Sequence, residues 1–281
     1  GDAFAAVWFC TTENQKRHAP KRATACALEM QKLAESQPPS SSSPLSFKIG
    51  IGSGKLTLFH LGGMQERWMI LPGGSALTHA IQAEGEATPG QVIVSEETWG
   101  WIQSEYTAEQ VGKSSYWRIK KMNLAARPLP MPKMRFKESI EPILWCYIPE
   151  VVRSRLDVGQ YDWLGEIRRL CVLFIHLPDI NLGAELESIH LLVKQVQHSI
   201  LGYQGSINKL SIDEKGVSAL AVFGLPPMVH DNDGERAVQA ALELHASLKA
   251  EQKGCSIGIT TGYAFCGVVG SELRREYTVI G

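Results

Sequence analysis

The sequence has little of three features that mark specialised protein classes: paired cysteines, an excess of charge of one sign, and long apolar runs. Its six cysteines form no CxxC pair, which argues against a zinc site or a disulfide framework. The chain has 28 Lys and Arg against 29 Asp and Glu, so it has no basic excess to neutralise phosphates. No apolar run approaches the ~18 residues needed to cross a bilayer, and no signal peptide is visible. These absences predict a cytoplasmic protein without a nucleic-acid partner or a transmembrane segment.

Two proline-rich stretches divide a sequence that is otherwise ordinary for a globular protein, with 44% hydrophobic residues. The first, at 35–46, is predicted to be a surface loop. The second, at 125–142, ends a domain, since 281 residues suffice for about two domains. We therefore predict a first domain at 1–140, a helical connector at 141–166 and a second domain at 167–281.

An internal repeat is the most informative feature of the organisation. The first copy contains an expected strand at 1–9, an Ala-rich helix at 21–36 and an expected strand at 47–62. The corresponding segments of the second copy are 215–224, 231–248 and 255–270. Two copies of one module in a single chain predict an intramolecular pseudo-dimer, with the possibility of a site shared between the halves.

The second copy also predicts how its sheet is built. Residues 202–224 contain two β-type runs joined at the turn sequence DEKG. The run LCVLFIHL at 170–177 is continuously apolar, which is typical of a central strand covered on both faces. These features predict an α+β fold made of two ferredoxin-like (βαββαβ) domains.

An ordered set of motifs gives a more specific indication: GDAFAAVW, KIGIGSG, INK, SIGITTG, FCGVVG and RREYTVIG. With these motifs the chain resembles the tandem catalytic region of class III nucleotidyl cyclases, of the bicarbonate-responsive soluble adenylyl cyclase type. The resemblance implies that two cyclase homology halves pair within the chain and share an active site. It also implies conversion of ATP to 3′,5′-cyclic AMP and pyrophosphate by a two-metal mechanism.

The resemblance implies a metal-binding role for Asp2, in the position of a family carboxylate. Two Mg²⁺ ions, with Mn²⁺ or Ca²⁺ as substitutes, would lower the pKa of the ribose 3′-hydroxyl and hold the phosphates. An Asp that follows Gly is otherwise usually a turn residue. In the second half His176 and Val217 stand at the two metal positions, and valine cannot bind Mg²⁺.

The resemblance implies that four further residues contact the nucleotide. Lys209 matches the family's adenine-binding lysine, which can donate to adenine N1 but not to the protonated N1 of guanine. Thr278 matches the partner position near the exocyclic amine, with the Val279 backbone nearby, and Lys48 matches a catalytic lysine that reaches the terminal phosphate. The alternative for Lys209 is a surface lysine on a strand, and for Lys48 a lysine that protects a sheet edge.

Several departures from the family pattern keep a second hypothesis open. Pro72 replaces a family glycine, and His79 stands where an arginine implicated in bicarbonate activation is expected. An imidazole binds anions less well than a permanent guanidinium, so bicarbonate sensing is doubtful. One metal Asp and the transition-state Asn and Arg are expected outside the sequence, so we expect a fragment with each domain incomplete and little activity alone. The alternative function is a degenerate cyclase-homology module that binds a nucleotide without turnover.

Overall fold

The structure, a computed structural model, describes residues 4–36, 46–123, 138–157, 159, 165–178, 186–213, 216–271 and 274–281. The chain divides into two compact units. The first consists of residues 1–57 and 72–134, and the second of residues 58–71 and 135–281. The short segment 58–71 therefore leaves the first unit and returns to it. Among the described residues no helix combines the length and the apolar character that crossing a membrane requires.

The first unit contains a four-stranded sheet with three helices. Its strands lie in the order β1 (Ile49–Ile51), β4 (Val92–Ser95), β6 (Tyr116–Met122) and β5 (Tyr106–Gln110). Its helices are α1 (Glu13–Ser36), α2 (Ser75–Gly85) and α3 (Glu96–Ile102). Small residues of α1 pack on the sheet, since Ala23 and Ala27 share a core with Val92, Val94 and Ile102. This accounts for the predicted helix at 21–36, which extends to Glu13.

The strand expected at residues 1–9 is absent from its described part. Residues 4–11 have no regular secondary structure, and Phe4 and Phe9 are 62% and 67% exposed. A strand is stabilised by hydrogen bonds to a neighbour, and no described strand pairs with this segment. The prediction of a strand was therefore wrong for residues 4–9, although the apolar pattern is that of a strand.

The strand expected at 47–62 is divided into β1 and β2 (Thr57–Met64). The break at residues 52–56 follows from close packing against α2, because a Cβ on Gly52 would lie 2.3 Å from the Ala76 carbonyl oxygen. The turn is fixed by the Ala76 amide, which donates to the Lys55 carbonyl oxygen at 3.2 Å.

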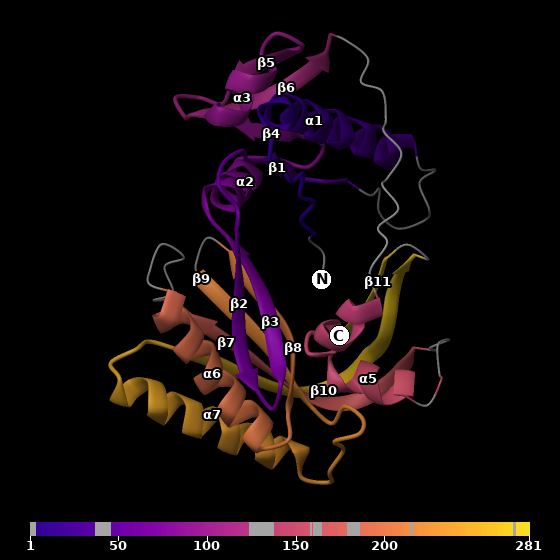
Figure 1. Ribbon diagram of the computed structural model, residues 1–281, viewed down its shortest axis with the longest axis vertical. Coiled ribbons are helices and arrows are strands. Elements are labelled where there is room, and N and C mark those ends of the chain that lie inside the picture. Colours follow the sequence, from indigo (N-terminus) through magenta and orange to yellow (C-terminus); the bar gives the residue numbers. More distant parts are fainter. Residues whose placement is uncertain are drawn as a thin grey trace. The chain divides into compact units, whose positions relative to one another are not determined.

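The second unit contains a five-stranded antiparallel sheet in the order β11-β10-β7-β9-β8. Along the chain its elements are η1 (Glu138–Ile140), α4 (Glu141–Trp145), α5 (Glu150–Asp157), β7 (Glu166–Leu177), α6 (Leu186–Gly202), β8 (Ser206–Asp213), β9 (Gly216–Phe223), α7 (Asp233–Ala250), β10 (Ser256–Ser271) and β11 (Arg274–Ile280). Helices α6 and α7 lie on one face of the sheet (Figure 1). From β7 to β10 the order is strand, helix, strand, strand, helix, strand.

Strand β7 is central in this sheet, as its apolar sequence predicted, but only one face is fully covered. Leu173 and Ile175 are completely buried with α6 and α7, whereas Phe174 between them is 60% exposed. Alternate residues of a strand point to opposite faces. The prediction that both faces are covered was therefore wrong at Phe174, and an aromatic ring lies open on the face away from α6 and α7.

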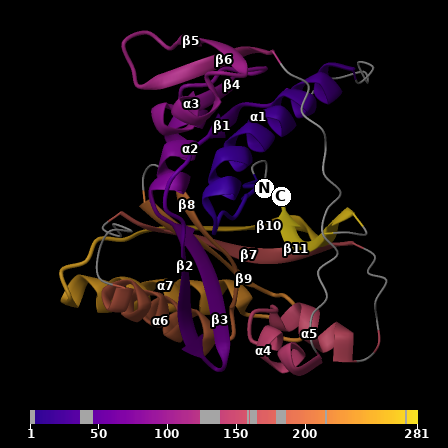
Figure 2. The ribbon, with the colours of Figure 1, turned by 45° about the horizontal axis from the view of Figure 1, so that its top comes forward.

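The segment 58–71 forms most of a hairpin of β2 and β3 (Arg67–Gly73), and it is part of the core of the second unit (Figure 2). Leu61 and Leu71 are completely buried there and share a cluster with residues of α6. The side chain of Gln197 on α6 holds the hairpin, since it donates to the Arg67 carbonyl oxygen at 2.9 Å and accepts from the Met64 amide at 3.2 Å. The hairpin is thus fixed by both apolar packing and hydrogen bonds.

Candidate functional site

The open face of the second unit's sheet carries a row of four residues in register. Lys209 on β8 pairs with Leu220 on β9, which pairs with Phe174 on β7, which pairs with Gly258 on β10. Lys209 is exposed, and a Cβ added to Gly258 would meet no atom within 4 Å. An ammonium group and an aromatic ring therefore face solvent on the same side of the sheet, beside a position without a side chain.

The two positions aligned with family metal ligands lie side by side on this sheet. His176 pairs with Ser218, and the neighbouring Leu177 pairs with Val217. The Nδ1 atom of His176 lies 3.4 Å from the Ser218 hydroxyl, while Val217 is completely buried in the core. Within the part of the chain that the structure describes, no group of three or more His, Cys, Asp or Glu side chains could hold a metal ion. The described residues of this half therefore do not fit a metal.

The structure places Thr278 and Val279 on β11, where they pair with Gly267 and Cys266. Thr278 is 8% exposed and Val279 is half-buried. Strands β11 and β8 are at opposite ends of the strand order, with β10, β7 and β9 between them. No strand pairing thus brings Thr278 beside Lys209, and their joint contact with adenine stays a prediction.

The structure gives little support for the predicted roles of Asp2 and Lys48, the two site residues of the first half. Asp2 lies outside the described residues. Lys48 is exposed and directly precedes β1, which is an edge strand of its sheet. The backbone around Lys48 is fixed, since the Phe47 carbonyl oxygen accepts from the Gly90 amide at 2.8 Å and the Ile49 amide donates to Gln91 at 3.1 Å. This position suits a lysine that protects a sheet edge, and the predicted contact with a phosphate is untested.

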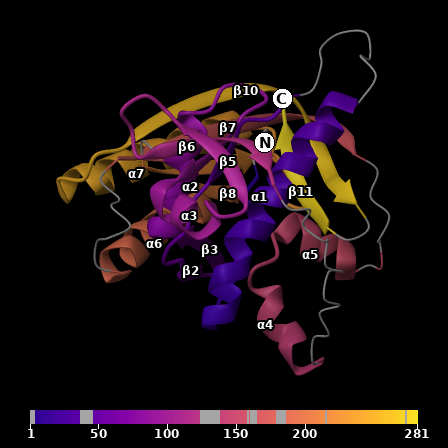
Figure 3. The same cartoon turned by 90° about the horizontal axis from the view of Figure 1, so that it is seen from above.

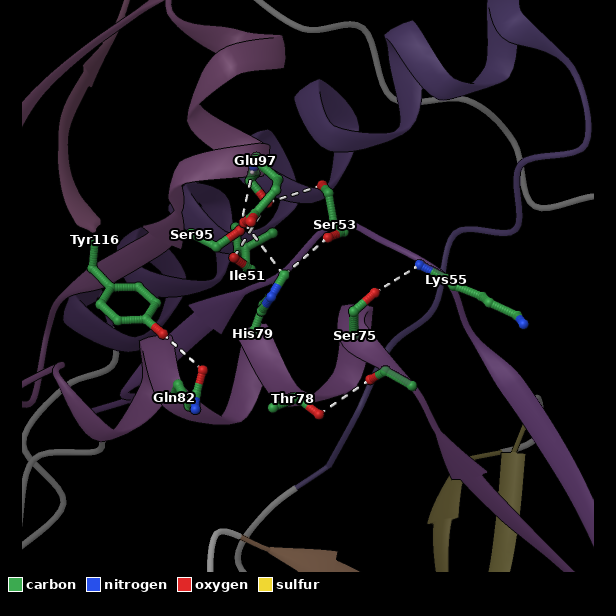
Figure 4. A network of polar contacts seen from close by, with 12 residues as sticks. Ile51, Ser53, Lys55, Ser75, Thr78, His79, Gln82, Ser95, Glu97 and Tyr116 are labelled. Carbon is green, nitrogen blue, oxygen red and sulfur yellow. Dashed lines mark hydrogen bonds and ion pairs between the residues drawn. The ribbon is translucent and has the colours of Figure 1, made fainter. Parts of the chain in front are cut away.

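His79 lies in a polar network of the first unit that joins α2, α3 and the turn after β1 (Figure 4). Its Nδ1 atom is 3.2 Å from the Ser53 carbonyl oxygen and 3.3 Å from a carboxylate oxygen of Glu97. The Ser53 hydroxyl in turn lies 2.9 Å from the hydroxyl of the buried Thr98. His79 therefore has an acidic partner already in place.

The pKa of Glu97 is lowered although partial burial acts to raise it. Hydrogen bonds from its own backbone amide and from the Ser95 hydroxyl outweigh the burial, and the nearby His79 adds to them. Sequence reasoning missed Glu97 as a partner of His79. The sequence SEET at 95–98 does signal a helix start, and Ser95 caps α3 by accepting from the Thr98 amide at 3.3 Å. A cap signal says nothing, however, about a histidine on another helix.

Comparison with known proteins shows which family model and which proteins the chain resembles. Residues 1–122 match the family model described as the adenylate and guanylate cyclase catalytic domain. The whole chain is 24% identical to adenylate cyclase type 10 of Mus musculus, and likewise to that of Homo sapiens. The alignments cover 100% of this chain but only 19% of each relative.

Solved structures similar to the chain include a bacterial light-regulated adenylyl cyclase, at 16% identity and a TM-score of 0.43. That alignment covers 51% of this chain and 45% of the other. The guanylyl cyclase Cya2 is 24% identical with a TM-score of 0.36, over 42% of this chain and 66% of the other.

Proposed function

We propose that the protein is an adenylyl cyclase that converts ATP to 3′,5′-cyclic AMP and pyrophosphate, because residues 1–122 match the family model described as the adenylate and guanylate cyclase catalytic domain. The similarity to adenylate cyclase type 10, which extends over all of this chain and 19% of each relative, supports ATP as the substrate. We also propose that the chain holds two ferredoxin-like halves, at 1–140 and 167–281, that pair within the chain. The segment 58–71 belongs to the first half by sequence, although it packs in the second compact unit. The strand order of the second unit supports this architecture.

The proposed reaction is an intramolecular displacement at phosphorus. The ribose 3′-oxygen bonds to the α-phosphorus, the bond from that phosphorus to the oxygen bridging to the β-phosphate breaks, and pyrophosphate leaves. The 3′-hydroxyl proton is lost in the same process. The protein's task is to orient the ribose and to stabilise the charge that develops on the phosphates.

The row of Lys209, Leu220, Phe174 and Gly258 on the open face, in which Leu220 is half-buried, is the single observation that carries the proposal for ATP. An aromatic ring and an aliphatic side chain provide a flat surface for a purine. The ammonium group of Lys209 can donate to adenine N1, which has a free lone pair, whereas guanine N1 carries a proton. For Thr278 and Val279 the proposal is supported by the sequence resemblance alone.

We propose that the reaction requires divalent metal ions and that Asp2, which lies outside the described residues, is a metal ligand. No described residue is proposed as a ligand. Such ions, Mg²⁺ or in its place Mn²⁺ or Ca²⁺, supply charge neutralisation at the phosphates when bound. The second half does not fit an ion, because Val217 is buried and apolar at one of the two aligned positions. This asymmetry agrees with a site in which one half holds metal and the other holds the base.

We expect the full-length natural polypeptide to form cyclic AMP from ATP, and to form no cyclic GMP from GTP at a comparable rate. The measurement is product formation by chromatography with each nucleotide, in the presence of Mg²⁺ or Mn²⁺. ATP binding without any product would overturn the enzymatic proposal and favour the nucleotide-binding regulatory module. A higher rate with GTP would overturn the substrate assignment.

Bicarbonate is expected to leave the rate of cyclic AMP formation unchanged. The Glu97 carboxylate already pairs with His79 and would repel a second anion at that place. The test compares rates with sodium bicarbonate and with sodium chloride, at matched pH and ionic strength. A several-fold stimulation by bicarbonate alone would contradict this expectation.

A further inference from the structure

Helix α5 precedes β7, the first strand of the second unit's five-stranded sheet. It lies against β10 and β11 and away from α6 and α7 (Figures 1 and 3). Val151 on this helix is 2% exposed and packs in a cluster with Leu170, Cys266 and Tyr277. The cluster lies on the sheet face opposite α6 and α7, because Leu170 and Leu173 on β7 point to opposite faces. Helix α5 of the predicted connector thus packs on the sheet of the second unit.

An ionic group fixes α5 at this place. One carboxylate oxygen of Glu166, the first residue of β7, lies 2.8 Å from Nη2 of Arg155 on α5 and 2.7 Å from Nε of Arg168. Arg155 is one turn from Val151 on the same side of the helix. The close contact with the Arg168 guanidinium is the largest cause that lowers the pKa of Glu166, so the carboxylate is charged at neutral pH. The Arg155 and Glu166 side chains are only 22% and 31% exposed, which makes this pair stronger than a fully solvated one.

The same cluster holds the strand segment that contains the predicted nucleotide contacts. Tyr277 is 9% exposed in the cluster, and Val279 packs against it. Burial raises the pKa of Tyr277 to about 12, so its phenol stays neutral. Thr278 lies between these two residues and points to the other face, because side chains alternate along a strand. Tyr277 and Val279, the two neighbours of Thr278, therefore share an apolar cluster with Val151 of α5, while the β11 backbone is paired with β10.

We infer that α5 positions the strand segment 277–279. The ion pair between Arg155 of α5 and Glu166 of β7 holds the helix against the sheet. Arg155, Glu166 and Val151 act through this segment and do not themselves touch the nucleotide. Helix α5 belongs to the connector between the two halves. A displacement of this helix would therefore change the nucleotide affinity of segment 277–279. The inference rests on the proposed function, since it requires that 277–279 contact the nucleotide.

The experiment compares three variants of the full chain. Arg155→Met removes the charge but keeps an unbranched side chain of similar length. Arg155→Lys keeps the charge, and Arg153→Met is the matched control, since Arg153 on the same helix lies over the Trp145 ring and not at Glu166. ATP affinity is measured by titration calorimetry, and amide hydrogen exchange is followed across residues 274–280.

Arg155→Met is expected to weaken ATP binding about fivefold, the size typical of coupling through a packed network. Faster exchange in β11 should accompany the loss, Arg155→Lys should restore most of the affinity, and Arg153→Met should change neither quantity. Unchanged ATP affinity in Arg155→Met overturns the inference, whether or not exchange becomes faster. If Arg155→Met does not fold, Glu166→Gln, which removes the charge and keeps hydrogen-bonding atoms, serves as the same test. A wild-type chain that does not bind ATP overturns the proposed function, and the inference fails with it.

Discussion

Replacing Leu61 with alanine is expected to destabilise the second unit by about 3 kcal/mol, although Leu61 comes from the first half of the sequence. Leu61 is completely buried and belongs to the cluster that contains β7, α6 and α7. Removing three carbon atoms there loses transfer free energy and leaves a cavity. Gln197 holds the hairpin backbone at two points, so the hairpin cannot easily move to fill that cavity.

The control is Leu58→Ala, the same change on the same strand, where the side chain is 45% exposed and little stability should be lost. Urea unfolding gives the free energies, and hydrogen exchange shows where the loss occurs. Faster exchange in α6 is the expected outcome. If Leu61→Ala instead accelerated exchange in β4 of the first unit and left α6 unchanged, the assignment of the hairpin to the second unit would be wrong.

The elements of the second half were predictable because their periodicity agrees with their final environment. The expected strand at 215–224 is β9 at 216–223, and the expected helix at 231–248 is α7 at 233–250. In both, the apolar spacing of the sequence is the spacing that the core requires. The two expected β-type runs at 202–224 are β8 and β9, which pair as neighbours from Asp213 and Gly216 onward, with Gly216 at φ 124°.

The first half shows what local patterns do not determine. The apolar segment 4–9 has a strand pattern, but strand formation depends on a hydrogen-bonded neighbour that no local pattern specifies. Likewise, nothing in the sequence around Leu61 indicates that its packing partners lie more than a hundred residues further along the chain. The break between β1 and β2 depends on the close approach of Gly52 to a helix that the sequence does not place.

The sequence predicted some features of the candidate site and missed others. Lys209 could be identified because its motif INK lies in a recognisable hairpin, and the structure exposes it on that hairpin. Phe174 was predicted to be covered, because a continuous apolar run does not reveal which face stays open. The pairs His79–Glu97 and Arg155–Glu166 were not predicted, since each joins two elements whose relative placement follows only from the fold.

Replacing Lys209 with alanine is expected to weaken ATP binding by at least about tenfold, because hydrogen bonds to charged groups contribute about 1.5–3 kcal/mol. GTP binding should change little, since guanine N1 offers no acceptor to the lysine. The variant should fold normally, because Lys209 is exposed on an edge strand and its removal leaves no cavity. The measurement is titration of the full chain with each nucleotide.

Lys249→Ala is the matched control, because Lys249 is an exposed lysine of the same unit that lies on α7, away from the open face. It removes the same charge, so it corrects for long-range attraction of the triphosphate, which acts on any cation. Equal losses in the two variants would mean that Lys209 acts only through charge, as a surface lysine does. A selective loss of ATP in Lys209→Ala would place adenine on the row of Leu220 and Phe174. The Thr278 side chain points to the opposite face of the sheet from that row, so it would then not contact the same adenine.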